Sequence, residues 1–191
     1  MGGSGSSSGK GGGGGNYTAH AVRLTEQDWY DWQVDPEAFQ QALLEGTVPR
    51  YGAEGKQLTQ QEKQRIFDVA HQLQNQGLDT LNAKVKETYR GESYASLEAA
   101  QKVFRSGSTY TTKKLTSLTT DRSTAEEYAS MGSGGNIKVI QIITSVKGTR
   151  GVRVPNSSEI VAPKGISYKI TGTTVDRKNN TLKVYLFRKD R

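Results

Sequence analysis

The feature of the sequence that most constrains its fold is a change of hydrophobic period near Lys84. Before this point, Ile66, Val69 and Leu73 recur at steps of three and four residues, which is the period of an amphipathic helix. After it, apolar and polar residues alternate, beginning at residues 85–89, which is typical of a β-strand. Helices first and strands afterwards predict an α+β protein with a mainly antiparallel sheet.

The first half of the chain contains three recognisable helix starts. Thr25 stands before acidic residues and predicts an N-cap with an acidic first turn. Pro36 occupies the first position of a second helix, and Thr59–Glu62 has the spacing of a capping box that begins a third. We expect Gly77 to end the third helix. The two tryptophans of the chain are interpreted as helix-packing residues, with a binding role as the alternative.

The second half of the chain has mostly strand character. Strands are expected at residues 84–91, 115–119, 137–143, 166–170 and 182–187, and from residue 159 onward. Short helices are expected at residues 97–104, capped by Ser96, and at residues 124–131, capped by Asp121. Residues 106–114, which include Tyr110, have the composition of a polar loop. No internal repeat is evident, and the order of these elements favours the α+β class.

The composition divides the chain into a leader and two regions. Residues 1–15 are almost entirely glycine and serine, cannot bury apolar surface and are predicted to form a flexible leader. Residues 16–83 form a helical region and residues 84–191 a β-rich region, and the chain length predicts one structural domain from about residue 16 to 191. We find no apolar run long enough to span a membrane and no secretory signal, so no membrane partner is expected.

Charge is distributed unevenly between the two regions. Residues 1–83 contain 6 Lys/Arg and 10 Asp/Glu, whereas residues 84–191 contain 20 Lys/Arg and 9 Asp/Glu, so their net charges are −4 and +11. The basic region predicts an anionic partner, namely a phosphorylated cofactor, a nucleic acid or an acidic protein face. Solubilising lysines on strand surfaces are the alternative interpretation.

The cysteine and histidine content excludes several classes of site. The chain has no cysteine, which excludes disulfides, thiol catalysis and cysteine-ligated zinc. His20 and His71 are far apart in the sequence and have no nearby carboxylate pattern, so no metal site is expected.

One carboxylate stands apart within the basic region. Glu159 lies between a predicted turn at Pro155 and Asn156 and an apolar run that starts with Ile160 and Val161. A carboxylate at the junction of a loop and a buried strand is partly desolvated and held in place. A solvated loop glutamate is the alternative that this stretch alone leaves open.

Four segments follow one another in the second half of the chain. They are Tyr89–Gly91 on a strand, Leu115–Ala125 as a strand that runs into a helix, Gly148–Val152, and Ser157–Gly165. In this order and at these intervals, they resemble the Arg…Ser-x-Ser/Thr…Glu core of the mono-ADP-ribosyltransferases. That family contains bacterial toxins, phage enzymes and secreted effectors. The resemblance covers about residues 59–187 and depends on the order of the four motifs, each of which is common by itself.

The resemblance implies a split antiparallel β-sheet core that binds NAD as the substrate. Arg90 would contact the phosphates of NAD, because a planar guanidinium suits phosphate oxygens. Gly91 would let its backbone approach the nicotinamide amide, since it has no Cβ. Tyr110 would stack on the nicotinamide or flank the bound NAD, although packing in the core is the preferred interpretation of this residue.

The resemblance also implies the catalytic residues, which are Arg90, Ser117 and Glu159. Ser117 would hydrogen-bond near the nicotinamide ribose and orient Glu159. Thr119 would support the strand at the third position of its motif and, like Ser117, belong to the NAD-binding residues. Glu159 would bind the ribose 2′-hydroxyl and stabilise the positive charge that develops as nicotinamide leaves. A surface strand arginine and an ordinary strand serine are the alternatives for Arg90 and Ser117 taken singly.

The sequence departs from the family at Ser157, the acceptor-side position two residues before Glu159. Many members have Glu or Gln there, and the glutamate of arginine-modifying members engages the acceptor guanidinium. A serine has no charge with which to polarise a guanidinium, so arginine is not favoured as the acceptor. We expect the acceptor to be recognised elsewhere, on the basic surface.

Three functions remain open at this point. The leading hypothesis is a transferase that cleaves NAD at the nicotinamide glycosidic bond and transfers ADP-ribose to a protein or a nucleic acid. The alternatives are an NAD glycohydrolase and a non-catalytic basic module that binds nucleic acid. We expect a monomer that acts in the cytoplasm of the producing cell or of a target cell, as a toxin, a secreted effector or a phage enzyme.

Overall fold

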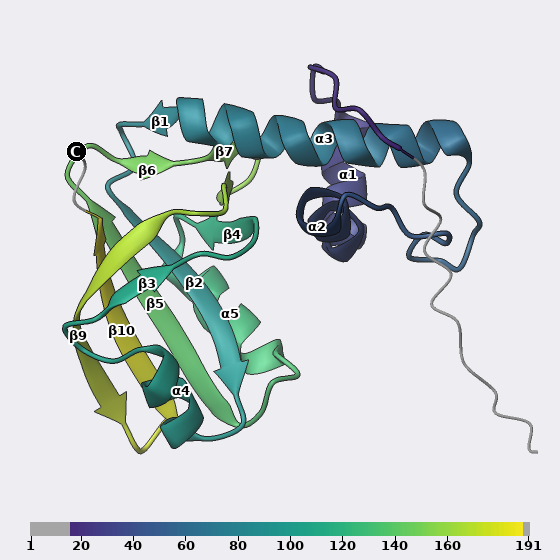
Figure 1. Cartoon of the computed structure of the whole chain (residues 1–191). Helices are drawn as coiled ribbons and strands as arrows, with labels where there is room; N and C mark the ends of the chain where they lie inside the picture. The colour runs from purple at the N-terminus through teal and green to yellow at the C-terminus, as the bar shows by residue number, and fades with distance from the viewer. Residues whose placement is uncertain (1–15, 189–191) are drawn as a thin grey trace, which may run out of the picture. The chain divides into compact units, whose positions relative to one another are not determined.

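The computed structural model describes residues 16–188, which contain five helices and ten strands (Figure 1). The predicted flexible leader at residues 1–15 lies outside the described residues. Helices dominate the first half and strands the second, so the α+β prediction is confirmed. The chain forms two compact units that divide between Gln72 and Leu73, inside the third helix. The single structural domain expected from the chain length stays a prediction.

The first unit begins with two capped helices. α1 (Glu26–Val34) starts with a capping box, in which Thr25 Oγ1 accepts from the backbone N–H of Asp28 at 3.3 Å. In return, Asp28 Oδ2 accepts from the backbone N–H of Thr25 at 2.7 Å. α2 (Pro36–Glu45) has proline in its first turn, and Asp35 is its N-cap. Both predicted helix starts are confirmed.

Aromatic side chains build much of the core of the first unit. Trp32 is 2% exposed and packs edge-on against Phe39, with the ring centroids 5.8 Å apart. Trp29 is buried as well. The tryptophans are therefore helix-packing residues, as predicted, and the α1–α2 pair is held by ring contacts.

The third helix, α3 (Gln60–Asp79), is longer than the sequence predicts. It starts at the expected capping box, where Thr59 and Glu62 exchange two hydrogen bonds. The prediction that Gly77 ends the helix is wrong, because the helix continues through it. A Cβ at Gly77 would lie 3.0 Å from Cδ of Pro163, so the absence of a side chain at Gly77 allows Pro163 to pack closely against α3.

The end of α3 that belongs to the second unit is tied to the loop after residue 162. The side chain of Gln74 donates to the backbone carbonyl of Lys164 at 3.1 Å and accepts from its N–H at 2.8 Å. This pair of bonds connects the last part of α3 to the loop before β9 within the second unit.

The second unit is built on an eight-stranded sheet with the order β3-β9-β10-β5-β2-β4-β8-β7. Its strands are β2 (Glu87–Tyr94), β3 (Thr109–Thr111), β4 (Thr116–Thr119), β5 (Ile137–Ser145), β7 (Val152–Arg153), β8 (Glu159–Ala162), β9 (Ser167–Asp176) and β10 (Thr181–Arg188). Neighbouring strands are antiparallel except β5 and β10, which are parallel. Two further strands, β1 (Leu81–Asn82) and β6 (Thr149–Arg150), pair with each other.

The sheet is nearly divided between β2 and β4, which are joined by one register pair, Tyr89 and Thr119. By contrast, β2 pairs with β5 along its whole length, and β4 pairs with β8 over all four of its residues. We call the Tyr89–Thr119 pair the seam. The split that was expected in the sheet is present as this narrow junction.

Helix α5 (Arg122–Met131) packs along β2 in the second unit (Figure 1). Gly91 allows this packing, because a Cβ there would lie 1.8 Å from the backbone carbonyl oxygen of Ala125. The prediction that the strand ends at Gly91 is wrong, because β2 continues to Tyr94. Since side chains alternate along a strand, Arg90 and Glu92 lie on the face opposite to the one that α5 covers.

The other face of the sheet carries the main core of the second unit. Helix α4 (Leu97–Val103), capped by Ser96 as predicted, contributes to it. The core consists of Ala100, Phe104, Leu118, Val139, Ile143, Ala162, Ile166, Tyr168, Ile170, Leu182, Val184 and Leu186. Tyr110 packs against this cluster from β3, so the polar loop predicted for residues 106–114 is wrong at its centre.

No helix within residues 16–188 is both long enough and apolar enough to cross a membrane.

Candidate active site

The three predicted catalytic residues are joined by hydrogen bonds in the second unit. Arg90, on β2, donates from Nη1 to the backbone carbonyl of Ser117 at 3.0 Å. Ser117, on β4, donates from Oγ to Glu159 Oε1 at 2.7 Å. Glu159 is the first residue of β8. The fold thus brings together residues that are 27 and 42 positions apart in the sequence, while their catalytic roles stay predictions.

Strand register explains how Ser117 reaches Glu159. In the antiparallel β4–β8 pair, Ser117 lies opposite Val161 and Thr119 lies opposite Glu159. Residues two apart on one strand point to the same face, so Ser117 and Glu159 are diagonal neighbours across the two strands. The longer glutamate side chain spans this diagonal to the serine hydroxyl.

The backbone of Glu159 is held as well as its side chain. Its N–H donates to Ser157 Oγ at 3.0 Å, and its carbonyl accepts from the N–H of Val154 at 3.0 Å. The turn before it is confirmed by Asn156, whose φ is 55°. Glu159 is half-buried and hydrogen-bonded within a strand, so the alternative of a solvated loop glutamate is wrong.

Ser157, the predicted acceptor-side residue, shapes the approach to β8. Its hydroxyl oxygen accepts from the backbone of Glu159 two residues later, which is a local turn in which the side chain replaces a backbone acceptor. This contact fixes the position from which the glutamate side chain starts. An acceptor-side role for Ser157 stays a prediction.

Thr119 connects the seam to the start of α5. It is buried, its Oγ1 lies 3.0 Å from Oγ of Ser158, and it accepts from the backbone N–H of Asp121 at 3.0 Å. Asp121 is in turn the N-cap of α5. These contacts agree with the expected support of the strand, and the contact of Thr119 with NAD stays a prediction.

Glu92 is a member of the site that the sequence reasoning missed. Its Oε1 accepts from Arg90 Nε at 2.8 Å, and the two side chains are 21% and 22% exposed, respectively. The available signal was the spacing, because residues 90 and 92 of a strand share one face. The motif on which the resemblance rests contains no residue at this position.

The side chain of Arg90 has one nitrogen left for a substrate. Nε binds Glu92 and Nη1 binds the Ser117 carbonyl, while Nη2 has no hydrogen-bond partner among residues 16–188. A fixed guanidinium with a spare donor suits a phosphate oxygen. The arrangement therefore fits the predicted contact between Arg90 and the phosphates of NAD.

Tyr110 and Gly91 have structural roles that their sequence context left open. The Tyr110 ring lies 5.2 Å from that of Phe104, and burial, followed by the negative charge of Glu92, raises the pKa of its hydroxyl. Packing, which was the preferred interpretation, accounts for Tyr110, and the close approach of α5 accounts for Gly91. Contacts of either residue with NAD stay predictions.

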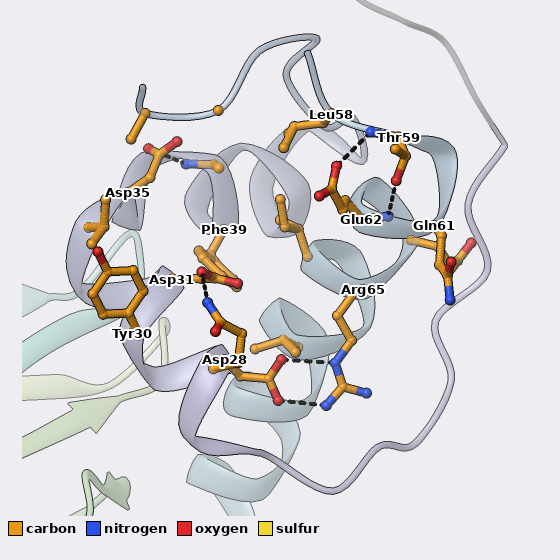
Figure 2. A pocket seen from close by; sticks show the side chains of 18 of the residues that line it. Asp28, Tyr30, Asp31, Asp35, Phe39, Leu58, Thr59, Gln61, Glu62 and Arg65 are labelled. Carbon is orange, nitrogen blue, oxygen red and sulfur yellow. Dashed lines mark hydrogen bonds and ion pairs between the residues drawn. The ribbon is translucent and has the colours of Figure 1, made fainter. Parts of the chain in front are cut away.

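A separate pocket of about 1080 Å³ lies wholly within the first unit (Figure 2). None of the predicted site residues lines it, although carboxylates surround it. Asp35 caps α2, and Glu62 belongs to the capping box of α3 (Figure 2). These acidic groups have structural partners, so we assign the pocket no chemistry.

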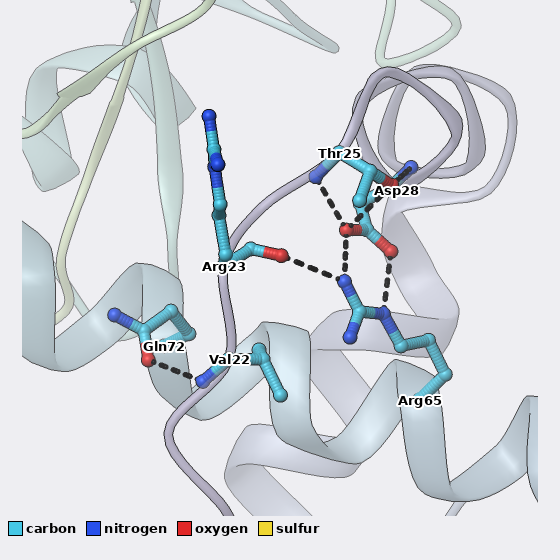
Figure 3. Close-up of polar contacts among 6 residues, drawn as sticks. All are labelled: Val22, Arg23, Thr25, Asp28, Arg65 and Gln72. Carbon is cyan, nitrogen blue, oxygen red and sulfur yellow. Dashed lines mark hydrogen bonds and ion pairs between the residues drawn. The ribbon is translucent and has the colours of Figure 1, made fainter.

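Asp28, which also lines that pocket, forms an ion pair with Arg65 that holds the start of α1 against α3 (Figure 3). Arg65 donates from Nε at 2.9 Å and from Nη2 at 2.5 Å, and Nη2 also reaches the backbone carbonyl of Arg23. Burial acts to raise the pKa of Asp28, but the hydrogen bonds from Arg65 and Thr25 outweigh it and lower the pKa. The pair is a structural element of the first unit.

Among residues 16–188, no three His, Asp or Glu side chains lie close enough together to hold a metal ion.

Comparison with known proteins gives matches at the level of structure. No protein-family model matches the sequence, and no curated protein is similar to it in sequence. The Vis toxin, an ADP-ribosyltransferase from Vibrio splendidus, matches with a TM-score of 0.53 and 14% identity, over 84% of this chain and 70% of that one. Exoenzyme S from Pseudomonas aeruginosa, crystallised with human 14-3-3 protein beta and Carba-NAD, matches with a TM-score of 0.52 and 14% identity, over 82% of this chain and 68% of that one.

At such identities these similarities establish the fold and leave the activity open. They agree with the helix-then-sheet order of the chain described above. The fold implied by the sequence resemblance is therefore confirmed, and the chain has the fold of the mono-ADP-ribosyltransferases.

Proposed function

We propose that the protein is a mono-ADP-ribosyltransferase that cleaves NAD and transfers ADP-ribose to a macromolecular acceptor. One observation carries the proposal, namely the continuous set of hydrogen bonds that joins Arg90, Ser117 and Glu159 across the seam. Strand pairing brings the three residues close together, and the hydrogen bonds hold them in one arrangement, which supports a common role. The fold shared with Vis toxin and exoenzyme S supports the same class.

The proposed chemistry assigns each of these residues one task. Arg90 binds a phosphate oxygen of NAD through Nη2 and positions the substrate. The bond between ribose C1′ and the nicotinamide nitrogen breaks, and its electron pair leaves with nicotinamide. Glu159 accepts a hydrogen bond from the ribose 2′-hydroxyl and stabilises the positive charge that develops on the sugar. An acceptor atom then bonds to C1′ and releases its proton.

The acceptor is proposed to be a protein or a nucleic acid that meets the basic region. Exoenzyme S was crystallised with a 14-3-3 protein, and the net charge of +11 over residues 84–191 favours an anionic surface on the partner of this chain. The hydroxyl oxygen of Ser157 is engaged with the backbone of Glu159. Arginine is therefore not favoured as the modified residue, because no carboxylate at this position awaits its guanidinium.

The same observation on Ser157 favours a second candidate, an NAD glycohydrolase. If no side chain at this position orients an acceptor, water reaches C1′ and the products are nicotinamide and free ADP-ribose. The two candidates share Arg90, Ser117 and Glu159 and differ only in the acceptor.

The test is NAD consumption by the full chain beside its Glu159→Gln variant, with labelled NAD and a cell lysate. We expect the variant to lose activity by about 10²-fold or more, because the positive charge on the sugar lacks its carboxylate. Label that protease removes identifies a protein acceptor, and label that nuclease removes identifies a nucleic acid. Free ADP-ribose without labelled polymer supports the glycohydrolase.

The remaining alternative, a non-catalytic nucleic-acid-binding module, makes the opposite prediction. It expects no NAD consumption and salt-dependent binding that Glu159→Gln leaves intact. We further propose that the protein acts as a monomer in a cytoplasm, of its own cell or of a target cell, as a toxin or effector. Sedimentation and a growth assay with wild type and Glu159→Gln expressed inside cells test this part.

A further inference from the structure

Glu92 accepts three hydrogen bonds on the face of β2 that carries Arg90. Oε1 accepts from Arg90 Nε at 2.8 Å, while Oε2 accepts from Gln141 Nε2 at 3.2 Å and from the Tyr94 hydroxyl at 3.3 Å. The partners come from β2 itself and from the neighbouring β5. The carboxylate is therefore held on both sides before any ligand binds.

Gln141 gives independent evidence that the Glu92 carboxylate is held in a defined position. It lies opposite Arg90 in the β2–β5 register and is 1% exposed, in the middle of the apolar run of β5. A buried amide is costly unless it is hydrogen-bonded, and its Nε2 is directed at Glu92. Burial raises the pKa of the Tyr94 hydroxyl, and the nearby charge of Glu92 adds to this shift, so Tyr94 stays protonated and donates.

We propose that Glu92 is the residue that positions Arg90 for the phosphates of NAD, an inference that rests on the proposed function. With Nε bound to Glu92 and Nη1 bound to the Ser117 carbonyl, the plane of the guanidinium is fixed at two of its three nitrogens. Nη2 is then presented in one orientation. Glu92 acts through Arg90 and makes no contact with the reacting atoms.

A role of Glu92 in orienting Arg90 and a role of its negative charge predict different effects of substitution. A carboxylate beside Arg90 partly neutralises the cation, so its charge alone does not favour phosphate binding. If its task is to hold Nε, glutamine preserves the effect, because its oxygen still accepts from Arg90 and its NH2 group can donate to the Tyr94 hydroxyl or to the oxygen of a turned Gln141 amide. Alanine retains neither contact and abolishes the effect. Loss of orientation weakens substrate binding, so it appears in KM for NAD rather than in kcat.

The experiment compares the full chain with Glu92→Ala, Glu92→Gln and a matched control, Glu87→Ala. Glu87 is an exposed carboxylate on the same strand, and its bond is to the hydroxyl of Tyr89. We expect KM for NAD to rise about tenfold in Glu92→Ala with kcat within about twofold, and to return to within about threefold of wild type in Glu92→Gln. Glu87→Ala should leave both constants unchanged.

Thermal unfolding of each variant and a milder change, Tyr94→Phe, separate positioning from folding. Tyr94→Phe removes one donor to Glu92 and is expected to raise KM about twofold to threefold in a stably folded protein. An unchanged KM in Glu92→Ala overturns the inference, and so does an equal rise in Glu92→Gln or a loss of kcat alone. A wild-type protein that does not consume NAD overturns the proposed function itself, which is a different result.

Discussion

Ser117 Oγ lies 2.7 Å from Glu159 Oε1, although the strand register places Ser117 opposite Val161 and Glu159 opposite Thr119. The contact is therefore a diagonal one that depends on the first residue of β8 being in place. It connects β4, the strand that pairs with β2 at the seam, to Glu159, the first residue of β8.

Removing the Ser117 hydroxyl should slow NAD turnover without unfolding the protein. Ser117→Ala deletes the donor to Glu159 but leaves the backbone carbonyl that binds Arg90. We expect NAD consumption to fall about tenfold, because a hydrogen bond to a charged group is lost. Ser167→Ala, which removes an exposed hydroxyl on β9, is the control, and equal activities in the two variants would contradict the role of Ser117.

Ser157→Ala tests whether that residue serves the backbone or the acceptor. Loss of the bond to the Glu159 N–H should reduce NAD consumption and ADP-ribose transfer by the same factor, since both depend on the glutamate. Ser157→Asn, which retains a local acceptor, should recover most of the activity. A variant that lost transfer and kept NAD consumption would instead establish an acceptor-side role for Ser157.

Gly91→Ala should destabilise the second unit strongly. The new Cβ would overlap the carbonyl oxygen of Ala125, which belongs to the backbone of α5 and has no rotamer by which to move away. We expect the free energy of unfolding to fall by about 3 kcal/mol, as measured by urea denaturation. Gly172→Ala on β9 is a matched control, because its Cβ would meet nothing within 4 Å.

The ion pair of Asp28 and Arg65 predicts how stability depends on pH. The pKa of Asp28 is lower in the folded chain than its ordinary value near 4, so its contribution is complete above about pH 4. This contribution is lost as the pH falls through the lowered pKa and Asp28 becomes protonated. We expect Asp28→Asn to lose on the order of 2 kcal/mol at pH 7, and less at pH 2.

The measurement for this prediction is urea denaturation of the full chain at the two pH values. Asp31→Asn is the control, because Asp31 lies on α1 and its carboxylate accepts from the exposed side chain of Gln27 at 2.8 Å. A difference between wild type and Asp28→Asn that was the same at both pH values would contradict the role of the charge.

Local signals in the sequence were sufficient for most of the helices and strands and for the members of the motif. Thr25 and Thr59 predict helix starts because their side chains bond to backbone groups three residues away, and these bonds need no distant partner. Arg90, Ser117 and Glu159 were found because a resemblance fixes their order along the chain. Their meeting in space then depends on strand pairing that the order implies.

Features that depend on contacts between distant segments could not be predicted from local sequence patterns. Gly77 and Gly91 each accommodate another segment, and nothing local distinguishes such a glycine from one that ends a helix or faces a ligand. The parallel pairing of β5 with β10 is set by the whole sheet, and short β3 has too few residues to show a period. The spacing places Glu92 on the same strand face as Arg90, but the contact of its second oxygen with Gln141, which is 49 residues away, depends on strand pairing.

The seam gives the proposed site a mechanical consequence. One backbone pair joins β2 to β4, and Arg90 adds a hydrogen bond across the same junction by donating to the Ser117 carbonyl. A ligand that bound Arg90 on β2 and Glu159 on β8 would link the two parts of the sheet across this narrow junction. Occupancy of the site would then stiffen the whole sheet, and slower amide hydrogen exchange in β4 and β8 would be its signature.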